Sequence, residues 1–219
     1  MNIALDGPAG AGKSSIAKLV AKKLSFVYLD TGAMYRTIAL YVLNNGISSA
    51  DEEAVVARLD DIEITLSHEN GEQQIFLNGA NVSKEIRREE VGKTASAVAK
   101  YEKVRKKLVS LQHKIASEND VIMDGRDIGT VVLPNAEVKI YLTASSRVRA
   151  ERRYKELQEK GETCDLDQIE KDIILRDEQD MNREISPLRQ ADDAILVDSS
   201  DMSIEEVVNC LIDIIKKAD

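Results

Sequence analysis

Short runs of apolar residues alternate along the chain with longer segments in which apolar residues recur every three or four positions. The short runs predict strands at residues 2–5, 26–30, 121–124, 138–144 and 194–198. These runs are almost continuously apolar, so we expect strands that are buried on both faces, as in a parallel sheet.

The longer segments predict helices. After the first strand, helical spacing is carried by Ile16, Leu19, Val20 and Leu24. Further helices are expected through residues 34–45, which stop near Gly46, and at roughly 88–99, 102–118, 147–160, 167–183 and 204–217. Strands that alternate with helices predict an α/β fold of three layers, with helices on both faces of a parallel central sheet.

One stretch breaks this alternation. The sequences IEITLSH and QQIFLNG flank the turn-forming sequence ENGE and predict a β-hairpin at about residues 62–79. We therefore expect a single domain over residues 1–219 that contains an insert region at residues 60–100.

Composition narrows the possible partners. The chain has 219 residues, enough for a substantial core, and only 4% of them are aromatic, with no Trp. A net charge of −9 disfavours a nucleic-acid polymer, which usually needs a basic face. Any anion site must therefore come from a local cluster of Arg and Lys.

The cysteines and the N-terminal residues indicate the cellular compartment, and the histidines bear on zinc binding. Cys164 and Cys210 are far apart in sequence, as in a reduced cytosolic protein, and the isolated His68 and His113 do not suggest zinc. The N-terminal sequence MNIALDGPAG does not resemble a signal peptide, and no run approaches the ~18 apolar residues that span a bilayer. We expect a cytoplasmic protein without a membrane segment.

The most specific motif is GPAGAGKS at residues 7–14, which fits G-x-x-x-x-G-K-[ST]. In such a loop, backbone N–H groups and a helix N-terminus bind phosphates, the Lys reaches the β- and γ-phosphates, and the Ser ligates Mg²⁺. The alternative is a glycine-rich turn that only joins strand to helix, but the Lys and Ser favour phosphate binding. The predicted ATP ligands are Gly7, Pro8, Ala9, Gly10, Ala11, Gly12, Lys13, Ser14 and Ser15.

A kinase is the simplest protein to carry this loop. The chain contains no Asn-Lys pair and so lacks the N-K-x-D guanine reader of GTPases, and motor ATPases usually have much longer chains. Asp124 ends the strand at 121–124 and is a candidate to hold Mg²⁺ through water beside Ser14. Alternatively, Asp124 caps the turn before Gly125.

Arginines that follow strands or begin helices are candidates to bind a second anion. Such residues are Arg36, Arg105, Arg126, Arg176 and Arg183, although each could equally be a solvated or salt-bridged surface group. In the segment 167–183, the spacing of Arg176, Asp180 and Arg183 puts them on one helical face. Arg176 and Asp180 could form a helix salt bridge, or Asp180 could accept hydrogen bonds from ribose hydroxyls.

A third group of arginines lies in the helix at 147–160. Arg149, Arg152 and Arg153 are expected on one face, near a lid predicted at residues 154–165. Closure of a lid would exclude water and suppress ATP hydrolysis. The alternative is a solvated charged helix with Glu–Arg pairs.

Taken in order, DGPAGAGKSS, LDTGAMYR, EIRREEV, DGRDIGTVVLPNAEVKIYL and RDEQDMNREISPL resemble the bacterial-type cytidylate kinases, which belong to the nucleoside monophosphate kinases. The resemblance spans nearly the whole chain. It implies a P-loop kinase fold with a small β-containing insert that binds the monophosphate, and a helical lid. Thr31 stands where relatives also have Ser, which keeps the hydroxyl.

The resemblance also implies roles for residues. Arg36, Arg126 and Arg183 would bind the acceptor phosphate, Arg176 and Asp180 the ribose, and Ser96, Arg105 and Asp127 the cytosine, with Thr31 in the same substrate set. Uracil has a carbonyl where cytosine has its amino group, so Asp127 would favour CMP and dCMP over UMP. The implied catalytic residues are Lys13, Arg126, Arg153 and Arg183, with Arg152 and Arg153 on ATP and with Ser14 and Asp124 on Mg²⁺.

The expected protein is thus a monomeric ATP-dependent CMP/dCMP kinase. A nucleoside monophosphate has a second pKa of about 6, so its attacking oxygen is largely ionised and no general base is needed. Two alternatives stay open from the residues alone. One is a P-loop kinase for another small molecule, and the other is a nucleotide-binding regulatory module that turns over little.

Overall fold

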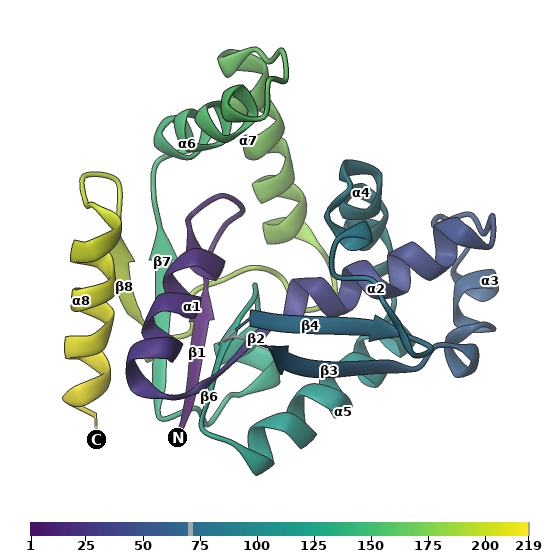
Figure 1. The fold of residues 1–219 in the computed structure, drawn as a ribbon, viewed down its shortest axis with the longest axis horizontal. Helices are drawn as coiled ribbons and strands as arrows, with labels where there is room; N and C mark the ends of the chain where they lie inside the picture. Colours follow the sequence, from purple (N-terminus) through teal and green to yellow (C-terminus); the bar gives the residue numbers. More distant parts are fainter. Residues whose placement is uncertain (70–71, 219) are drawn as a thin grey trace. The chain divides into compact units, whose positions relative to one another are not determined.

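The computed structural model describes residues 1–69 and 72–218, and the chain divides into two compact units. The first unit comprises Met1–Val27 and Asp120–Asp219, and the second comprises Tyr28–Asn119. The insert predicted at residues 60–100 lies inside the second unit, which extends beyond it in both directions. The second unit begins within β2 (Val27–Asp30) and ends just before β6 (Val121–Asp124) (Figure 1).

A parallel sheet organises the first unit. Its strands follow the order β6, β1 (Asn2–Asp6), β7 (Val138–Thr143) and β8 (Ile195–Asp198), and each neighbouring pair is parallel. Val27, the first residue of β2, donates its N–H to Asp120 O at 2.8 Å, next to the start of β6. The predicted α/β class and the positions of these strands are confirmed.

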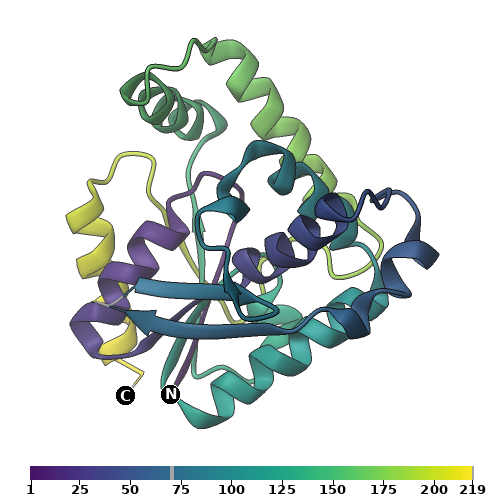
Figure 2. The same ribbon diagram turned by 45° about the vertical axis from the view of Figure 1, so that its right-hand side comes forward.

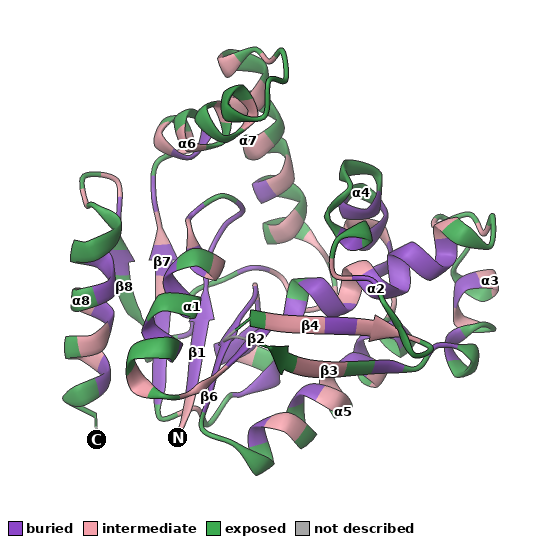
Figure 3. Cartoon of the chain, viewed as in Figure 1, coloured by how far each residue is buried: buried purple, intermediate pink, exposed green. Residues whose placement is uncertain are grey.

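The centre of this sheet is the core of the first unit. β1, β6 and most of β7 are buried, as Figure 3 shows. Helix α1 (Lys13–Leu24) packs against β6 and against α8 (Ile204–Lys216). The expected apolar face of α1 is partly wrong, because Leu19 is 42% exposed, whereas Ala17 and Ala21 are buried.

Two further helices of this unit pack against each other, α6 (Ser146–Glu159) and α7 (Leu166–Asn182) (Figure 2). Arg147 on α6 pairs with Asp167 at 2.7 Å and with Glu170 at 3.1 Å on α7. The prediction that Arg183 shares a helical face with Arg176 is wrong. Helix α7 ends at Asn182, and Arg183 has an extended backbone with φ −66° and ψ 141°.

The second unit combines helices with a small antiparallel sheet. Its longer helices are α2 (Thr31–Asn44), α4 (Glu89–Val98) and α5 (Glu102–Glu118), and α2 packs against both α4 and α5. The predicted hairpin is confirmed as β3 (Ile64–Glu69) and β4 (Glu72–Leu77). Two residues of its expected ENGE turn, 70 and 71, lie outside the described residues.

Several short elements were not predicted. They are α3 (Glu52–Val56), β5 (Ala80–Asn81), the 3₁₀ turns Leu59–Asp61 and Glu85–Arg87, and a π-helical turn at Ile128–Val132. None is long enough to complete the periodic pattern by which helices and strands are recognised. Across the part of the chain that the structure describes, no helix has the length and apolar character needed to cross a membrane.

Candidate active site

The loop between β1 and α1 makes a turn that only glycine permits at its start. Gly7 has a φ of 146°, and a Cβ atom on it would lie 2.0 Å from the carbonyl oxygen of Leu142 on β7. Gly12, the N-cap of α1, has a φ of 88°. The loop therefore leads directly into a helix N-terminus, which is a favourable place for a phosphate group.

Lys13 begins α1 and is buried. Its Nζ donates to the carbonyl oxygens of Gly7 and Pro8, both at 2.7 Å. Burial and, next, the nearby charge of Arg126 together lower the pKa of the Lys13 amine to about 7, although nearby carboxylates oppose the shift. A bound triphosphate would raise this pKa, because negative charge next to an amine favours its protonated form.

Ser14 and Asp124 come together as the sequence predicts. The hydroxyl of Ser14 donates to Asp124 Oδ2 at 2.8 Å. Two oxygen ligands suit Mg²⁺, which is usually held by one or two protein oxygens together with water and substrate phosphates. Within residues 1–69 and 72–218 no cluster of three or more Asp, Glu, His or Cys could hold a metal ion.

A buried ion pair attaches α6 and α7 to the phosphate loop. Arg149 Nη1 lies 2.6 Å from Asp177 Oδ2 and donates to Ala9 O at 2.9 Å. The N–H of Ala9 donates to Asp177 Oδ1 at 3.4 Å. Sequence reasoning missed Asp177 because it resembles one more acid on a polar helix, and Arg149 was expected only as a member of the arginine cluster.

Replacing Asp177 by Ala is expected to lower the free energy of unfolding by about 3–5 kcal/mol, because it leaves the Arg149 charge buried and unpaired. Urea unfolding followed by circular dichroism measures this change. Asp172→Ala is the matched control, since Asp172 is an exposed residue of the same helix. Equal stability of the two variants would contradict the structural role of the ion pair.

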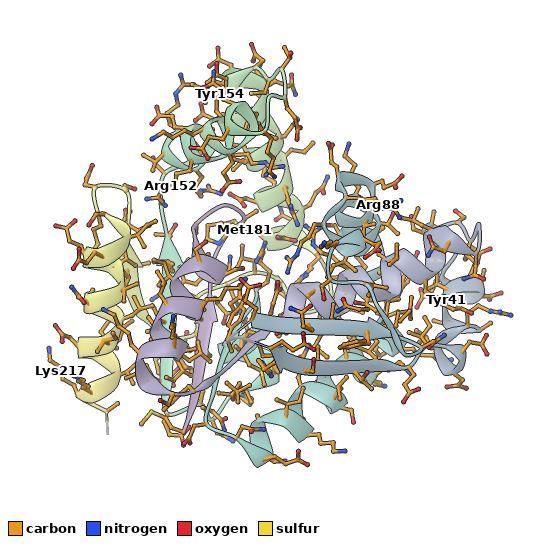
Figure 4. All side chains as sticks on the ribbon, in the orientation of Figure 1. Tyr41, Arg88, Arg152, Tyr154, Met181 and Lys217 are labelled. Carbon is orange, nitrogen blue, oxygen red and sulfur yellow. The ribbon has the colours of Figure 1, made fainter. Side chains whose placement is uncertain are left out.

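The other two arginines of α6 contact different groups. Arg152, labelled in Figure 4, donates to Ser199 O at 2.7 Å and to Ser199 Oγ at 3.3 Å. Arg153 is exposed and lies 3.1 Å from Glu156 Oε2, which is the Glu–Arg pair that the sequence left open. Arg149 is therefore the member of the expected cluster that contacts the phosphate loop.

Four of the proposed acceptor residues form two ion pairs with one another in the first unit. Arg126 Nε lies 2.9 Å from Asp180 Oδ2, so the ion pair of Asp180 is with this arginine, which the sequence did not suggest as its partner. Arg183 Nη2 lies 3.6 Å from Asp127 Oδ1, and both side chains are less than 10% exposed. Arg183 also donates from Nε to Ser186 O.

Arg176 is the fifth acceptor candidate in this unit. Its Nε is buried, and no described residue accepts a hydrogen bond from it. Burial lowers the pKa of its guanidinium, and the nearby charge of Arg126 lowers it further. A buried cation near another cation favours the binding of an anion or a polar ligand.

A second acid that the sequence did not single out is Asp6, the last residue of β1. It is buried and accepts hydrogen bonds from the N–H groups of Ile128 at 2.8 Å and Gly129 at 2.7 Å. Burial raises the pKa of the Asp6 carboxyl to about 6, while these two bonds and the charge of Lys13 oppose the shift. The only sequence signal was an acid at the end of a strand.

The raised pKa of Asp6 predicts that its contribution to stability falls as pH rises. Between the unfolded value of 3.8 and the folded value of about 6, the folded chain binds more protons than the unfolded chain. The free energy of unfolding should therefore decrease by up to about 3 kcal/mol across this window, relative to Asp6→Asn. Urea titrations of both proteins at pH 4 and pH 7 measure the difference, and a constant difference would contradict the shift.

The second unit holds the remaining candidates. Arg36 on α2 donates to Ile86 O at 3.1 Å, and its guanidinium packs against Gly92 on α4. Ser96 lies one turn further along α4 and donates to Gly92 O at 3.3 Å. Arg36, Gly92 and Ser96 therefore form a neighbouring group on two helices.

Arg105 and Thr31 are both buried in this unit. The guanidinium carbon of Arg105 lies 5.7 Å from the centre of the Tyr35 ring, and its Nη1 donates to Ala99 O at 3.4 Å. Thr31 is the first residue of α2, where the preceding Asp30 caps the helix by accepting from Ala33 N at 2.9 Å. All four candidates of this unit thus lie on α2, α4 or α5.

A comparison with family models decides where the chain belongs. Residues 3–217 match the model described as Cytidylate kinase. The chain belongs to the cytidylate kinase family. The resemblance that its motifs indicated is confirmed.

Two relatives agree with this membership, and one solved structure shares the fold. The cytidylate kinase of Lactobacillus johnsonii is 49% identical over 217 residues, which are 99% of this chain and 94% of that protein. The cytidylate kinase of Leuconostoc mesenteroides is 52% identical over 214 residues, which are 98% and 96% of the two chains. An uncharacterised protein from Eubacterium ventriosum, at 10% identity and a TM-score of 0.51 over 99% and 98% of the two chains, shares the fold.

Proposed function

We propose that this member of the cytidylate kinase family transfers the γ-phosphoryl group of ATP to CMP and dCMP, giving CDP and dCDP. The observation that carries the proposal is the family match over residues 3–217. The local geometry supports it, because the phosphate loop, its buried Lys13 and the Ser14–Asp124 pair provide the parts that a phosphoryl donor needs.

The donor would bind along the phosphate loop. Backbone N–H groups of the loop after Ala9 and the N-terminus of α1 would face the triphosphate, and Lys13 would contact its β- and γ-phosphates. Ser14 and Asp124 hold Mg²⁺, which when bound neutralises charge on the phosphate oxygens. Arg152 and Arg153 are the further ATP ligands that we propose on α6.

The acceptor residues that we propose divide by the part of CMP that they bind. Arg36, Arg126 and Arg183 bind its phosphate, Arg176 and Asp180 its ribose, and Ser96, Arg105 and Asp127 its cytosine, with Thr31 in the same substrate set. The buried, unpartnered Nε of Arg176 supports a polar ligand at this arginine. The buried carboxylate of Asp127 supports recognition of an amino group, because an ionised carboxylate only accepts hydrogen bonds.

The reaction needs alignment and charge neutralisation more than proton transfer. A phosphate oxygen of CMP forms a bond to the γ-phosphorus while the bond from that phosphorus to the β–γ bridging oxygen breaks, and ADP leaves. The attacking oxygen is already ionised, so no base is required. Lys13, Arg126, Arg153 and Arg183 would neutralise the charge that spreads over the transferred group.

A coupled assay of ADP formation with CMP, dCMP, UMP, AMP and GMP tests the function. We expect CMP and dCMP to give kcat/KM values about 10²-fold above that of UMP, because UMP would lose a hydrogen bond to a charged group, which contributes up to about 3 kcal/mol. A preference for a purine monophosphate, or ADP formation that no monophosphate increases, would contradict the proposal.

The same assay without acceptor tests the lid that we propose at residues 154–165. Exclusion of water from the donor site should keep ADP release slow with ATP and Mg²⁺ alone. Hydrolysis as fast as the CMP-dependent rate would contradict a lid with this role.

The oligomeric state, the location and the partners of the protein are part of the proposed function. We propose a cytoplasmic monomer that uses small nucleotides and binds no nucleic-acid polymer, and the net charge of −9 supports the last point. Size-exclusion chromatography with light scattering at assay concentration should give the mass of one chain. The mass of a dimer would contradict the monomer.

A further inference from the structure

The segment between β6 and β7 carries two of the proposed acceptor residues, Arg126 and Asp127, and it is attached to the end of β1. The N–H of Gly125 donates to Leu5 O at 3.1 Å. Further along, the Asp6 side chain receives the N–H groups of residues 128 and 129, one on each carboxylate oxygen. Backbone and side chain of β1 therefore hold the segment on both sides of Arg126 and Asp127.

The contact between Asp6 and this segment is close. A Cβ atom on Gly129 would lie 3.4 Å from Asp6 Oδ2, an ordinary van der Waals distance, and 3.2 Å from Lys139 Cδ, so residue 129 lies directly beside both side chains. The far end of the segment is held separately, because Lys139 Nζ donates to Pro134 O at 2.6 Å.

The same segment fixes the backbone of Asp127. The N–H groups of Val131 and Val132 both donate to Asp127 O, at 2.9 Å and 3.2 Å, within the π-helical turn. Such turns occur frequently at functional sites. Asp6 holds the first two residues of this turn, so the direction of the Asp127 side chain depends on where Asp6 keeps them.

A carboxylate is the group that this position requires. Burial of an anion costs free energy unless hydrogen bonds compensate for it, and Asp6 is only 4% exposed. An Asn side chain would fill the same volume, but its amide NH₂ would face one of the two N–H donors. The buried charge therefore provides two acceptors in a fixed geometry.

We propose that Asp6 is a positioning residue for acceptor recognition, which holds the turn at residues 128–129 and thereby orients Arg126 and Asp127. This inference rests on the proposed function and adds a residue that does not touch either substrate. Asp6 also directly precedes Gly7, so one residue joins the donor loop through its backbone and the acceptor segment through its side chain. Small displacements of positioning groups have large effects on rate.

The test compares wild type with Asp6→Asn at saturating ATP, measuring kcat and KM for CMP and for UMP. We expect kcat/KM for CMP to fall about tenfold, mainly through a higher KM, as for the loss of one hydrogen bond to a charged group. UMP should lose less, because its base does not depend on Asp127, so the CMP-to-UMP ratio should fall. Any effect of Asp6 on Lys13 or on ATP cancels in this ratio.

Two further variants keep the test informative. Asp6→Glu keeps the charge but moves the carboxylate relative to the two N–H donors and should lower the same ratio, so it carries the test if circular dichroism shows that Asp6→Asn does not fold. Lys139→Met is the control, because it keeps the aliphatic stem beside Gly129 and releases the far end of the segment at Pro134. It should lower the melting temperature and leave the ratio unchanged.

The outcomes separate the inference from the proposed function. A wild-type ratio in both folded Asp6→Asn and folded Asp6→Glu would overturn the role of Asp6 while CMP kinase activity stands. A fall of the ratio in Lys139→Met equal to that in Asp6→Asn would also overturn it, because any loosening of the segment would then suffice. A wild-type protein without CMP-dependent ADP formation would overturn the proposed function, and the inference with it.

Discussion

The Lys13→Met variant is expected to have a kcat for CMP about 10²–10³-fold below that of wild type. Lys13 is buried at the start of α1, with its amine beside the carbonyl oxygens of the phosphate loop. Met keeps the length and the apolar stem of the side chain but removes the charge that would stabilise the transferred phosphoryl group. Losses of this size follow the removal of one preorganised donor from a transition-state site.

The coupled ADP assay measures this loss, and circular dichroism checks that the variant is folded. Lys18→Met is the matched control, because Lys18 is an exposed residue of the same helix and the change removes the same charge. The control should keep wild-type kcat. A folded Lys13→Met variant with wild-type kcat would contradict the role of the phosphate loop in catalysis.

The Asp127→Ala variant is expected to lose most of its preference for cytosine. Asp127 is buried, so its carboxylate would meet the exocyclic amino group of cytosine without competition from water. Loss of a buried hydrogen bond that involves a charge should lower kcat/KM for CMP by about 10–10²-fold. UMP offers a carbonyl at the same position, so its kcat/KM should fall much less or rise.

The measurement is again the ratio of kcat/KM for CMP to that for UMP. The ratio is needed because Asp127 lies 3.6 Å from Arg183, and its removal could slow both acceptors by changing the charge around that arginine. Asp192→Ala, at an exposed position, is the matched control and should keep the wild-type ratio. An unchanged ratio in Asp127→Ala would show that another residue recognises the base.

Most of the fold was predictable because it depends on local patterns. Buried parallel strands are short apolar runs, so β1, β6, β7 and β8 could be placed within one or two residues. The phosphate loop could be assigned because its backbone geometry requires glycines, Lys and Ser at a fixed spacing. The closeness of Ser14 and Asp124 could be predicted because both follow or end strands of one parallel sheet, whose carboxyl ends lie at the same edge.

The rest of the site depends on partners that are distant in sequence. Asp6 accepts from an N–H group 122 residues away, and Asp177 accepts from one 168 residues away, so no window of the sequence contains both groups. The partner of Asp180 could not be found for the same reason, because the helix pattern offers Arg176 as one possibility and the fold supplies Arg126. The end of α7 before Arg183 was missed because helix boundaries are weakly encoded.

The attachment of Arg149 and Asp177 to Ala9 limits how the proposed lid can move. Arg149 lies in the first turn of α6, and the helix continues to Glu159, which is about 15 Å at the usual rise per residue. In the proposed lid, the end of α6 beside the phosphate loop would therefore act as the pivot, and the far end, with the connection at residues 160–165, would move. A small rotation about this pivot would displace the end of α6 near Glu159 by several ångströms at the lever length of ~15 Å. The contacts of Arg149 and Asp177 with Ala9 would be kept.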